Sequence, residues 1–518
     1  MKNHSRKYVT AIILSCTIGF VSVAQIDPSR VQQFISNNGY TTNSGLVEFY
    51  TLLNYKTAWI QTNNANDLTV LVNTLNRSAE MGLRKKDYGS DFIQSIYNKK
   101  IQLQSIRDSL DAEFKITVAA LQFYNDIAFG NTKPPIGYNG LKYAPACRDI
   151  PVLLAESISK NTLKSLDAQL AGAIPEMAVL ENRIRWILYI TSDSNYKEVI
   201  VSSKKINSTN TALITRLYQL GIIDATQLNL PDSILEKKVK EAQIQFNLPA
   251  DGVIRPTLLQ ELNTHLSVRL EQLNLSINYY RWLNCMAQIQ PVIVVNIPAA
   301  YMKVYDRSNV LLEMRMVVGK RSTPTPTLIS TVDEVVLYPY WHVPYSIATK
   351  EILPILKRNP GYINTGNYQV LNQAGRIIDP GTVNWNALSR SYFPYILRQS
   401  TGCDNALGLL KLNFTSPFGV YLHDTNGKGS FKYNRRYFSH GCMRMEKPME
   451  LGHLILKENR VAIDTLEQKG CLLNRSPITV HADVHMPVIV WYNPVGIDSA
   501  GRILFYEDIY GRFKQVKR

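Results

Sequence analysis

Hydrophobic residues recur every three or four positions through much of the N-terminal part of the chain. Such spacing places apolar side chains on one face of an α-helix, where they can be buried together. The clearest examples are Leu46-Val47-Phe49-Tyr50-Leu53 and Leu68-Leu71-Val72-Leu75. We therefore expect residues 25–205 to form a mainly helical domain.

A second helical region covers residues 206–265. The apolar face of one predicted helix there consists of Leu235, Val239, Ala242 and Phe246. Asp251-Gly252 then predicts a turn, because glycine tolerates the left-handed region and aspartate accepts hydrogen bonds from its own turn. The pattern predicts a helix on each side of this turn, after which residues 266–290 form a connecting helix.

Strand patterns follow the connecting helix. The run Val292–Ile297 is rich in β-branched residues and ends at Pro298, as a buried strand would. Two further apolar segments, Tyr301–Tyr305 and Val310–Gly319, are separated by turn residues and predict a hairpin. We expect a mainly β domain over residues 291–480.

The last part of the chain combines both patterns. Residues 346–400 form an insertion of mixed character within the β domain. Met449–Leu456 then predicts a helix and Thr479–Val490 a strand, and the C-terminal residues 481–518 are expected to contribute strands that complete the structure.

His481, Asp483 and His485 would alternate on one face of that strand. Three such residues can bind a metal ion, but an exposed polar edge is the better explanation of this pattern. No H-E-x-x-H or C-x-x-C motif supports a metal enzyme. We expect neither a metal nor another cofactor.

The stretch from Tyr421 to Arg444 carries the clearest chemistry. Cys442 follows Ser439-His440-Gly441, and His423 lies 19 residues before the cysteine. Cysteine catalysis needs a thiol and a base that meet in space rather than in sequence. We expect a strand end that carries His423 and a loop that folds back to face it. The alternative is a buried free cysteine beside surface histidines.

This stretch resembles the catalytic signature of the L,D-transpeptidases (YkuD type). In that family a histidine precedes S/T-H-G-C-x-R/N by a similar gap, and here H-D-T stands at 423–425 and R-x-F-S-H-G-C-M-R at 436–444. The form is similar to that of large Gram-negative members with extra domains. Further matches are V-N-I-P-A at 295–299 and V-V-G-K with T-P at 317–326. Departures are Tyr338 for the usual asparagine, Thr401 for a proline and Arg255 for a glycine.

The resemblance implies a multidomain α+β architecture. Residues 25–205 would be a helical scaffold, and residues 206–265 a small three-helix peptidoglycan-binding-like domain that either binds glycan or acts as a spacer. Residues 291–480 would be a β-sandwich-like catalytic domain. Residues 346–400 would be a capping subdomain over its active site.

The resemblance also implies a role for each residue of the signature. Cys442 would attack a peptide carbonyl and form a thioester, while His423 either takes the thiol proton or pairs with a thiolate. The amides of Gly441 and Cys442 would hold the oxyanion. His440 and Ser439 would be accessory.

Three further residues are expected to bind substrate: Arg444, Trp341 and Tyr421. Arg444 either binds a substrate carboxylate bidentately or pairs with a nearby acid such as Asp424. Trp341 either lines the substrate groove or is a core residue. The geometry of the folded chain has to decide between these roles.

The activity that the resemblance implies is peptidoglycan L,D-transpeptidation in cell-wall biogenesis. Tetrapeptide stems would be both donor and acceptor, the product would be a 3→3 cross-link, and a carbapenem would inhibit. Two alternatives remain: an L,D-carboxypeptidase or cysteine peptidase that uses water as acceptor, and a non-catalytic peptidoglycan-binding protein. The formal net charge of +16 suits a carboxylate-rich polymer. Nucleic acid is not expected, because the chain has no clustered basic stripe, zinc-finger spacing or Walker-type glycine loop.

The N-terminus predicts the compartment. Basic residues precede an apolar run over Tyr8–Val23, and Ser22-Val23-Ala24 offers a cleavage site, so residues 1–24 are expected to be a signal peptide for export to the periplasm. A lipoprotein signal at Cys16 and an uncleaved anchor are the alternatives. After cleavage, Cys442 would remain with four cysteines whose pairing the sequence leaves open: Cys147, Cys285, Cys403 and Cys471.

Overall fold

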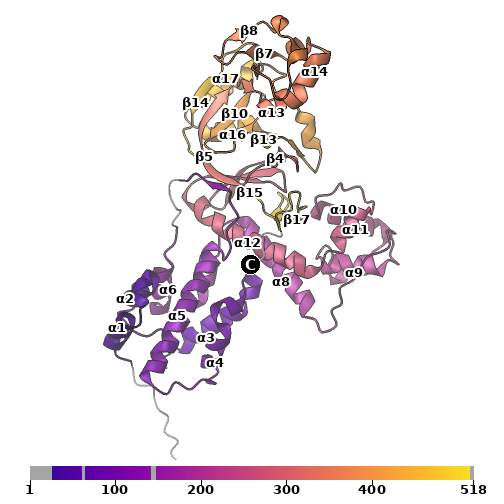
Figure 1. Cartoon of the computed structure of the whole chain (residues 1–518). Helices are drawn as coiled ribbons and strands as arrows, with labels where there is room; N and C mark the ends of the chain where they lie inside the picture. Colours follow the sequence, from indigo (N-terminus) through magenta and orange to yellow (C-terminus); the bar gives the residue numbers. More distant parts are fainter. Residues whose placement is uncertain (1–25, 61–64, 142–146, 514–518) are drawn as a thin grey trace, which may run out of the picture. The chain divides into compact units, whose positions relative to one another are not determined.

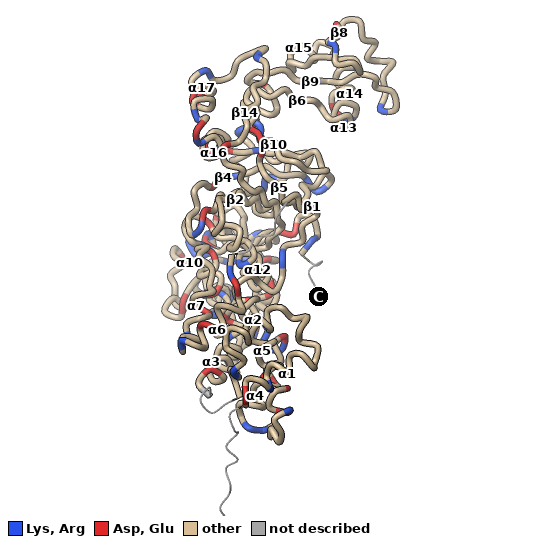
Figure 2. The backbone as a smooth tube through the Cα atoms, turned by 90° about the vertical axis from the view of Figure 1, so that its left-hand side faces the viewer, with Lys and Arg blue, Asp and Glu red and all other residues tan. Residues whose placement is uncertain are grey.

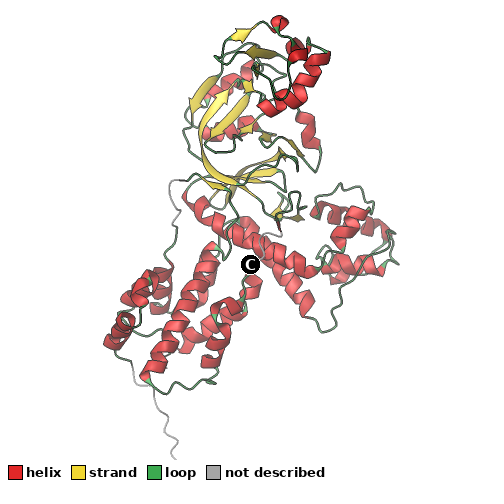
Figure 3. Ribbon diagram, viewed as in Figure 1, coloured by secondary structure: helices red, strands yellow, loops and turns green. Residues whose placement is uncertain are grey.

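The computed structural model describes residues 26–60, 65–141 and 147–513. The predicted signal peptide, residues 1–24, lies outside the described residues. The chain divides into two compact units, one made of residues up to 73 together with 89–121 and 150–166, the other of the remaining residues. Helices dominate the first unit and strands gather after the connecting helix of the second (Figure 3), which confirms the multidomain α+β fold class. The predicted domain limits stay predictions.

The first unit is helical, as expected from the spacing of its apolar residues. Its helices are α1 (Pro28–Asn37), α2 (Ser44–Leu52), most of α3 (Ala65–Asn76), α4 (Ser90–Tyr97), the first part of α5 (Ile106–Phe129) and α6 (Ile150–Ser159). At its centre, the Phe114 ring lies 4.7 Å from Tyr50, 5.0 Å from Tyr40 and 5.1 Å from Phe34, measured between centroids. Burial of such rings is the main source of stability in a small helical unit.

Glu113 of α5 is buried in the same unit. Its carboxylate accepts hydrogen bonds from the amides of Ala58, Trp59 and Ile60 and from the Tyr50 hydroxyl. Burial raises the pKa of Glu113 to about 7 although these bonds oppose the shift. The side chain thereby fastens an irregular segment to α5, since buried backbone amides need acceptors.

The helices of the second unit share one hydrophobic core with part of its sheet. They are α8 (Pro175–Ser192), α9 (Thr211–Gln219), α10 (Asp232–Gln245), α11 (Pro256–Leu262) and α12 (Leu266–Ile289), with the short α7 (Leu166–Leu170) before them (Figure 1). The region 206–265 therefore has the three predicted helices, with Gly252 at φ +79° in the predicted turn. The connecting helix is α12. Glu176 of α8 joins this region to the sheet through Lys303 (2.7 Å) and the Tyr305 hydroxyl (2.7 Å).

The β region is one sheet that closes on itself. Its strands pair in the order β5-β10-β11-β13-β4-β3-β2-β15, and β15 pairs again with β5. Their bounds are β2 Val292–Asn296, β3 Tyr301–Asp306, β4 Asn309–Gly319, β5 Leu328–Leu337, β10 Leu410–Phe414, β11 Leu422–His423, β13 Met443–Met445 and β15 Pro487–Trp491; β1 (Tyr138–Asn139), β12 (Tyr437–Ser439) and β14 (Ile478–His481) add to its edges. The long strands β4 and β5 take part in both layers, so the result is sandwich-like around a common core. The predicted first strand and hairpin, and the predicted helix as α16 (Pro448–Ile455), are confirmed; α17 (Val461–Lys469) follows.

The single strand predicted over Thr479–Val490 is wrong. The structure has two strands there, β14 and β15, and Asp483 lies in the loop between them. Its carboxylate accepts the amides of Glu458 and Asn459, both at 2.9 Å, and this contact turns the chain away from β14. The three polar residues of this segment therefore do not share one strand face. The C-terminal strands β16 (Val495–Ile497) and β17 (Ile503–Phe505) form a separate hairpin that packs in the core of the helices and does not join the large sheet.

The insertion forms a subdomain with a sheet and core of its own. Strands β6 (Trp341–His342), β9 (Ile396–Gln399), β7 (Tyr368–Leu371) and β8 (Ile377–Ile378) pair in that order, and α13 (Tyr345–Ile347), the π-helical turn Ala348–Ile352, α14 (Leu353–Arg358) and α15 (Tyr362–Thr365) complete it. These elements stay together in both views (Figures 1 and 2). We call residues 341–399 the cap. Basic and acidic residues are both scattered along the tube in Figure 2.

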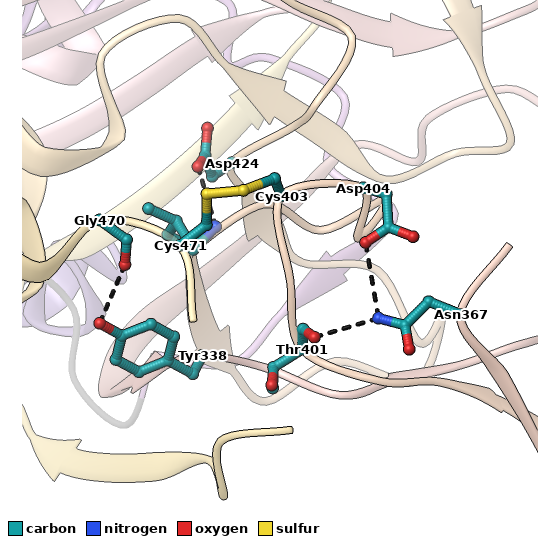
Figure 4. The surroundings of a disulfide bond; sticks show 9 residues. Tyr338, Asn367, Thr401, Cys403, Asp404, Asp424, Gly470 and Cys471 are labelled. Atoms are coloured by element: carbon teal, nitrogen blue, oxygen red, sulfur yellow. Dashed lines mark hydrogen bonds between the residues drawn. A yellow bond between two sulfur atoms is a disulfide. The ribbon is translucent and has the colours of Figure 1, made fainter. Parts of the chain in front are cut away.

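The structure pairs the four cysteines that the sequence left open. Cys147 bonds Cys285, and Cys403 bonds Cys471 (Figure 4), while Cys442 is free. The second disulfide joins the segment that leaves the cap to the segment after α17. No helix in the described ranges is long and apolar enough to cross a membrane.

Candidate active site

The catalytic sheet brings His423 and Cys442 together. Strands β11 and β13 pair in parallel, with His423 opposite Arg444, and the Met443 amide donates to the Tyr421 carbonyl at 3.1 Å. Side chains two positions apart lie on the same face of a strand. Tyr421 and His423 therefore share a face with Cys442 and Arg444, and neighbouring strands bridge the 19 residues between the cysteine and the histidine.

Lys411 of β10 belongs to this face and was missed from the sequence. It pairs with His423 in the antiparallel β10–β11 ladder, and its Nζ lies 4.1 Å from the centre of the Tyr421 ring. Burial lowers the pKa of Lys411, while the charge of a Cys442 thiolate would raise it. The alternation Leu410-Lys411-Leu412-Asn413-Phe414 shows a strand with one polar face, but only the register places that face beside the thiol.

The environment of the thiol favours its neutral form. Burial raises the pKa of Cys442 above its usual value, although the Tyr421 hydroxyl hydrogen bond, Lys411 and Arg444 act in the opposite direction. Burial raises the pKa of Tyr421, and the indole of Trp341, from strand β6 of the cap, opposes that shift. The cap thus comes near the Cys442 thiol through Trp341 and Tyr421, whose roles in substrate binding stay predictions.

His423 is held as a neutral base. It is 4% exposed, and its Nδ1 lies 2.5 Å from the Asp424 carbonyl oxygen. Burial, with the charges of Arg444 and Lys411, lowers the pKa of His423 to about 3. At neutral pH the ring therefore carries its proton on Nδ1, where the carbonyl accepts it, and Nε2 keeps a lone pair. A backbone carbonyl supplies the orientation that a carboxylate supplies in other triads.

The turn before the cysteine is built by Ser439 and Gly441. The Ser439 hydroxyl donates to the Cys442 carbonyl (2.5 Å) and accepts the Gly441 amide (3.1 Å), while Thr325 donates to the Gly441 carbonyl (2.8 Å). Gly441 has φ +117°, a conformation that favours glycine. The role of the Gly441 amide as an oxyanion donor stays a prediction. In that role the amide would release the Ser439 hydroxyl and donate its hydrogen bond to the substrate oxygen instead.

His440 points away from the thiol and toward the cap. Its Nε2 lies 2.6 Å from the Glu351 carboxylate and 3.4 Å from the Lys320 amine. Glu351 belongs to the π-helical turn of the cap. His440 therefore contacts the cap two residues before Cys442, and Trp341 beside Tyr421 is a second point at which the cap comes near the thiol.

The structure contradicts one of the two roles predicted for Arg444, the ion pair with Asp424, and the binding of a substrate carboxylate stays a prediction. Asp424 forms its ion pair with Lys428 and not with Arg444. In the described part of the chain no carboxylate lies within 4.0 Å of the Arg444 guanidinium, which is half-buried beside the thiol. A half-buried cation without an acidic partner is suited to a substrate carboxylate.

Asp424 and Gly408 position the base, and neither was predicted in that role. The Asp424 carboxylate accepts the Leu409 amide at 2.9 Å, which fixes the residue whose carbonyl holds His423. Gly408 has φ +61°, and a Cβ placed there would lie 2.3 Å from the same carboxylate. Figure 4 shows Asp424 in the surroundings of the Cys403–Cys471 disulfide. Next to Cys471, the Gly470 carbonyl accepts a hydrogen bond from the Tyr338 hydroxyl, and two residues before Cys403, the Thr401 carbonyl accepts one from the Asn367 amide.

We expect Gly408→Ala to lower the rate of Cys442 acylation by roughly 10²-fold, because a small displacement of a catalytic group has effects of this size. The new methyl group would push the Asp424 carboxylate aside and move the carbonyl that orients His423. Single-turnover acylation followed by intact-protein mass spectrometry measures the rate.

Gly419→Ala is the matched control. Gly419 also has φ +61°, but a Cβ there meets nothing within 4 Å. Both substitutions place an alanine in the left-handed region, which destabilises the fold by about 1–2 kcal/mol in each variant. Only Gly408→Ala should therefore lower the acylation rate. Equal losses in the two variants would show that backbone strain, and not the position of Asp424, is responsible.

One other cluster has the spacing of a metal site. His453 of α16 and the α17 residues Asp464 and Glu467 hold ligand atoms within 4.8 Å of one another. These side chains form ion pairs, and exposed acidic groups of this kind are common without a metal. The cluster does not include any residue of the catalytic face.

Comparisons with known proteins relate part of the chain to a family. Residues 290–463 match the family model of the L,D-transpeptidase catalytic domain (YkuD), and residues 44–178 match a model described as a scaffold domain. A putative L,D-transpeptidase of Haemophilus influenzae is 36% identical over 226 residues, which are 43% of this chain and 45% of that protein. The match thus spans less than half of the length of this curated relative.

Solved structures are more distant. An L,D-transpeptidase from Mycobacterium smegmatis is 18% identical, covers 39% of this chain and 58% of its own, and has a TM-score of 0.19. The catalytic domain of an E. faecium L,D-transpeptidase, solved as the form acylated by ertapenem, is 14% identical, covers 39% of this chain and 97% of its own, and also has a TM-score of 0.19.

Proposed function

We propose that this chain, whose residues 290–463 match the L,D-transpeptidase catalytic domain, joins peptidoglycan stem peptides in 3→3 cross-links through an acyl-enzyme on Cys442. One observation supports this most directly. The β11–β13 pair places a free thiol on the same sheet face as a neutral histidine whose Nδ1 is held by a backbone carbonyl. A thiol and an oriented base are what acyl transfer requires.

The first half-reaction acylates the enzyme. His423 Nε2 takes the thiol proton as Cys442 Sγ attacks the carbonyl carbon between the third stem residue and the terminal D-alanine. The amide C–N bond breaks, the C–S bond of the thioester forms, and His423 returns the proton to the departing amine. The raised pKa of the Cys442 thiol and the lowered pKa of His423 favour a neutral resting pair over a standing thiolate–imidazolium pair, so the proton moves only as the sulfur attacks the carbonyl.

The second half-reaction releases the product. The side-chain amine of another stem attacks the thioester carbon, gives up a proton to His423 and forms the new amide. The Cys442 sulfur leaves and recovers that proton. Arg444 binds the terminal carboxylate of the donor, and Lys411 adds positive charge beside the thiolate that forms in each step.

The cap favours transfer over hydrolysis. It comes near the catalytic face at two points, through Trp341 beside Tyr421 and through Glu351 at His440. A cover of this kind excludes water from a thioester and lets a bound amine compete. We place the enzyme in the periplasm, where its stem peptides are, and this placement rests on the predicted signal peptide of residues 1–24.

The test uses the purified chain of residues 25–518, with a disaccharide-tetrapeptide as both donor and acceptor. Mass spectrometry should find dimers that have lost one D-alanine. Tripeptides without dimers would replace the proposal with an L,D-carboxypeptidase. No product from a protein with a titratable Cys442 thiol would favour a non-catalytic binding protein.

A further inference from the structure

A cavity of about 530 Å³ lies away from the catalytic face. Helix α8 contributes Asn182, Arg183 and Trp186, α10 contributes Glu241 and Gln245, and the loop after α9 and the tip of the β16–β17 hairpin complete the lining. Residues three or four positions apart lie on one face of a helix, so both helices turn one side toward the cavity. The volume falls within the range of small-molecule sites, roughly 300–1,000 Å³.

Arg183 brings an uncompensated positive charge to this cavity. Its guanidinium donates to the Leu220 and Gly221 carbonyls, and no carboxylate of the described residues lies within 4.0 Å of it. Burial lowers the pKa of Arg183 to about 10, so the group is still charged at neutral pH. Two of its five N–H groups are used by these carbonyls, and a half-buried cation without a carboxylate partner is suited to an anionic ligand.

Gln245 brings a donor without an acceptor. The residue is 7% exposed, it lines the cavity, and its Nε2 is buried with no hydrogen-bond partner. A buried amide that lacks a partner costs stability, about 1–3 kcal/mol. Other polar groups of the lining already have partners: Asp224 caps Thr226, and Arg502 pairs with Asp498. The Gln245 amide is therefore placed for a group that enters the cavity.

Trp186 gives the cavity an aromatic wall. The ring is half-buried, its Nε1 donates to the Tyr218 carbonyl at 3.2 Å, and a Cβ at Gly221 would lie 3.0 Å from the indole. Gly221 has φ +67° and so keeps both the indole and the Arg183 guanidinium uncovered by a side chain. An indole beside amide and carboxylate groups matches a pyranose, which has an apolar face of C–H groups and a polar rim.

We propose that this cavity binds a disaccharide of N-acetylated amino sugars that carries a carboxylate. The sugar ring lies against Trp186, the carboxylate meets Arg183, and an acetamido or hydroxyl oxygen accepts the Gln245 amide. The acidic lining residues Asp224 and Glu241 favour one carboxylate over the several charges of a nucleotide phosphate. The inference rests on the proposed function, since such sugars form the strands that carry the stem peptides, and it gives the enzyme a second, non-catalytic hold on its polymer.

Isothermal titration calorimetry of the chain of residues 25–518 tests the proposal. The probes are the disaccharide of N-acetylglucosamine and N-acetylmuramic acid, neutral diacetylchitobiose, and a stem tetrapeptide without sugar. The acidic disaccharide should bind, chitobiose should bind about tenfold more weakly, and the tetrapeptide should not bind at the cavity. Equal binding of chitobiose would overturn the role of Arg183, and no binding of either sugar would overturn the site.

Gln245→Met removes the amide and keeps the size of the side chain. It should weaken binding of the acidic disaccharide about tenfold. Gln288→Met is the matched control, because Gln288 also has a buried Nε2 without a partner but does not line the cavity. Equal affinities of Gln245→Met and Gln288→Met would overturn the role assigned to the amide. If Gln245→Met fails to fold by circular dichroism, Asn182→Ala on the exposed rim decides, with a several-fold loss expected.

Acylation by a carbapenem separates this proposal from the proposed function. Wild type and Gln245→Met should form the Cys442 adduct at the same rate, because the cavity has no residue of the catalytic face. A sugar-binding chain that forms no adduct and no cross-link would leave the cavity assignment standing and overturn the transpeptidase. A cross-linking chain that binds no sugar would do the reverse.

Discussion

Cys442→Ala is expected to abolish the covalent adduct that a carbapenem forms with the wild-type chain, and to abolish cross-linking with it. The reason is that Cys442 is the one free thiol among the described residues, since the other four cysteines form two disulfides. Intact-protein mass spectrometry of the form that lacks residues 1–24 measures the adduct directly. The same preparation should titrate one thiol in wild type and none in the variant.

His440→Ala is the control for this result. His440 lies two residues before the nucleophile, but its imidazole binds Glu351 of the cap and not the thiol. The variant should keep the adduct. It should lose part of its preference for an amine acceptor over water, because one of the two contacts between the cap and the catalytic face is gone.

Two outcomes would contradict the assignment of Cys442. An adduct that persists in Cys442→Ala would place the nucleophile elsewhere. A wild-type chain that is folded and has a titratable thiol, but forms no adduct, would mean that the thiol cannot be activated, and a peptidase of other specificity or a binding protein would become the better explanation.

The sequence predicted those elements whose pattern is local. Helix α12 and strands β2, β3 and β4 follow from the spacing of apolar residues within each segment. The break between β14 and β15 does not, because it depends on the Asp483 carboxylate accepting amides that lie 24 and 25 residues away. A tertiary contact of this kind leaves no periodic signal, so the segment was taken for one continuous strand.

The same distinction holds for the site. Cys442 and His423 could be predicted because a motif records their spacing. Lys411 could not, since only the β10–β11 register brings it beside His423, and Gly408 could not, since its importance lies in a contact with Asp424. The cysteine pairs and the absence of an acidic partner for Arg444 also depend on distances that the order of residues does not contain.

His423→Gln should lower the rate of acylation by roughly 10²–10⁴-fold, the usual contribution of a general base. Glutamine has a similar size and can still donate to the Asp424 carbonyl, so the fold should survive. It cannot take the thiol proton. Single-turnover acylation at constant pH measures the loss, and thermal unfolding checks that the variant is folded.

The pH dependence makes this test sharper. The wild-type pair reacts as neutral imidazole and neutral thiol, a state that exists above the His423 pKa of about 3 and below the raised pKa of Cys442. The wild-type rate should therefore be flat between about pH 5 and pH 8. In His423→Gln only the thiolate reacts, and its fraction rises tenfold with each pH unit below the thiol pKa, so the residual rate should climb with that slope.

The two profiles separate the two mechanisms that the sequence left open. A thiolate–imidazolium pair would make the wild-type enzyme react with iodoacetamide at mildly acidic pH, because the thiolate would already exist there. The structure predicts slow alkylation that rises with pH, since burial opposes both charges at once. The contrary result would be a wild-type acylation rate that changes with pH near the ordinary pKa of histidine, about 6.5. It would show that His423 titrates in the resting enzyme, and that the Cys442 proton is not transferred to a neutral, carbonyl-bound imidazole.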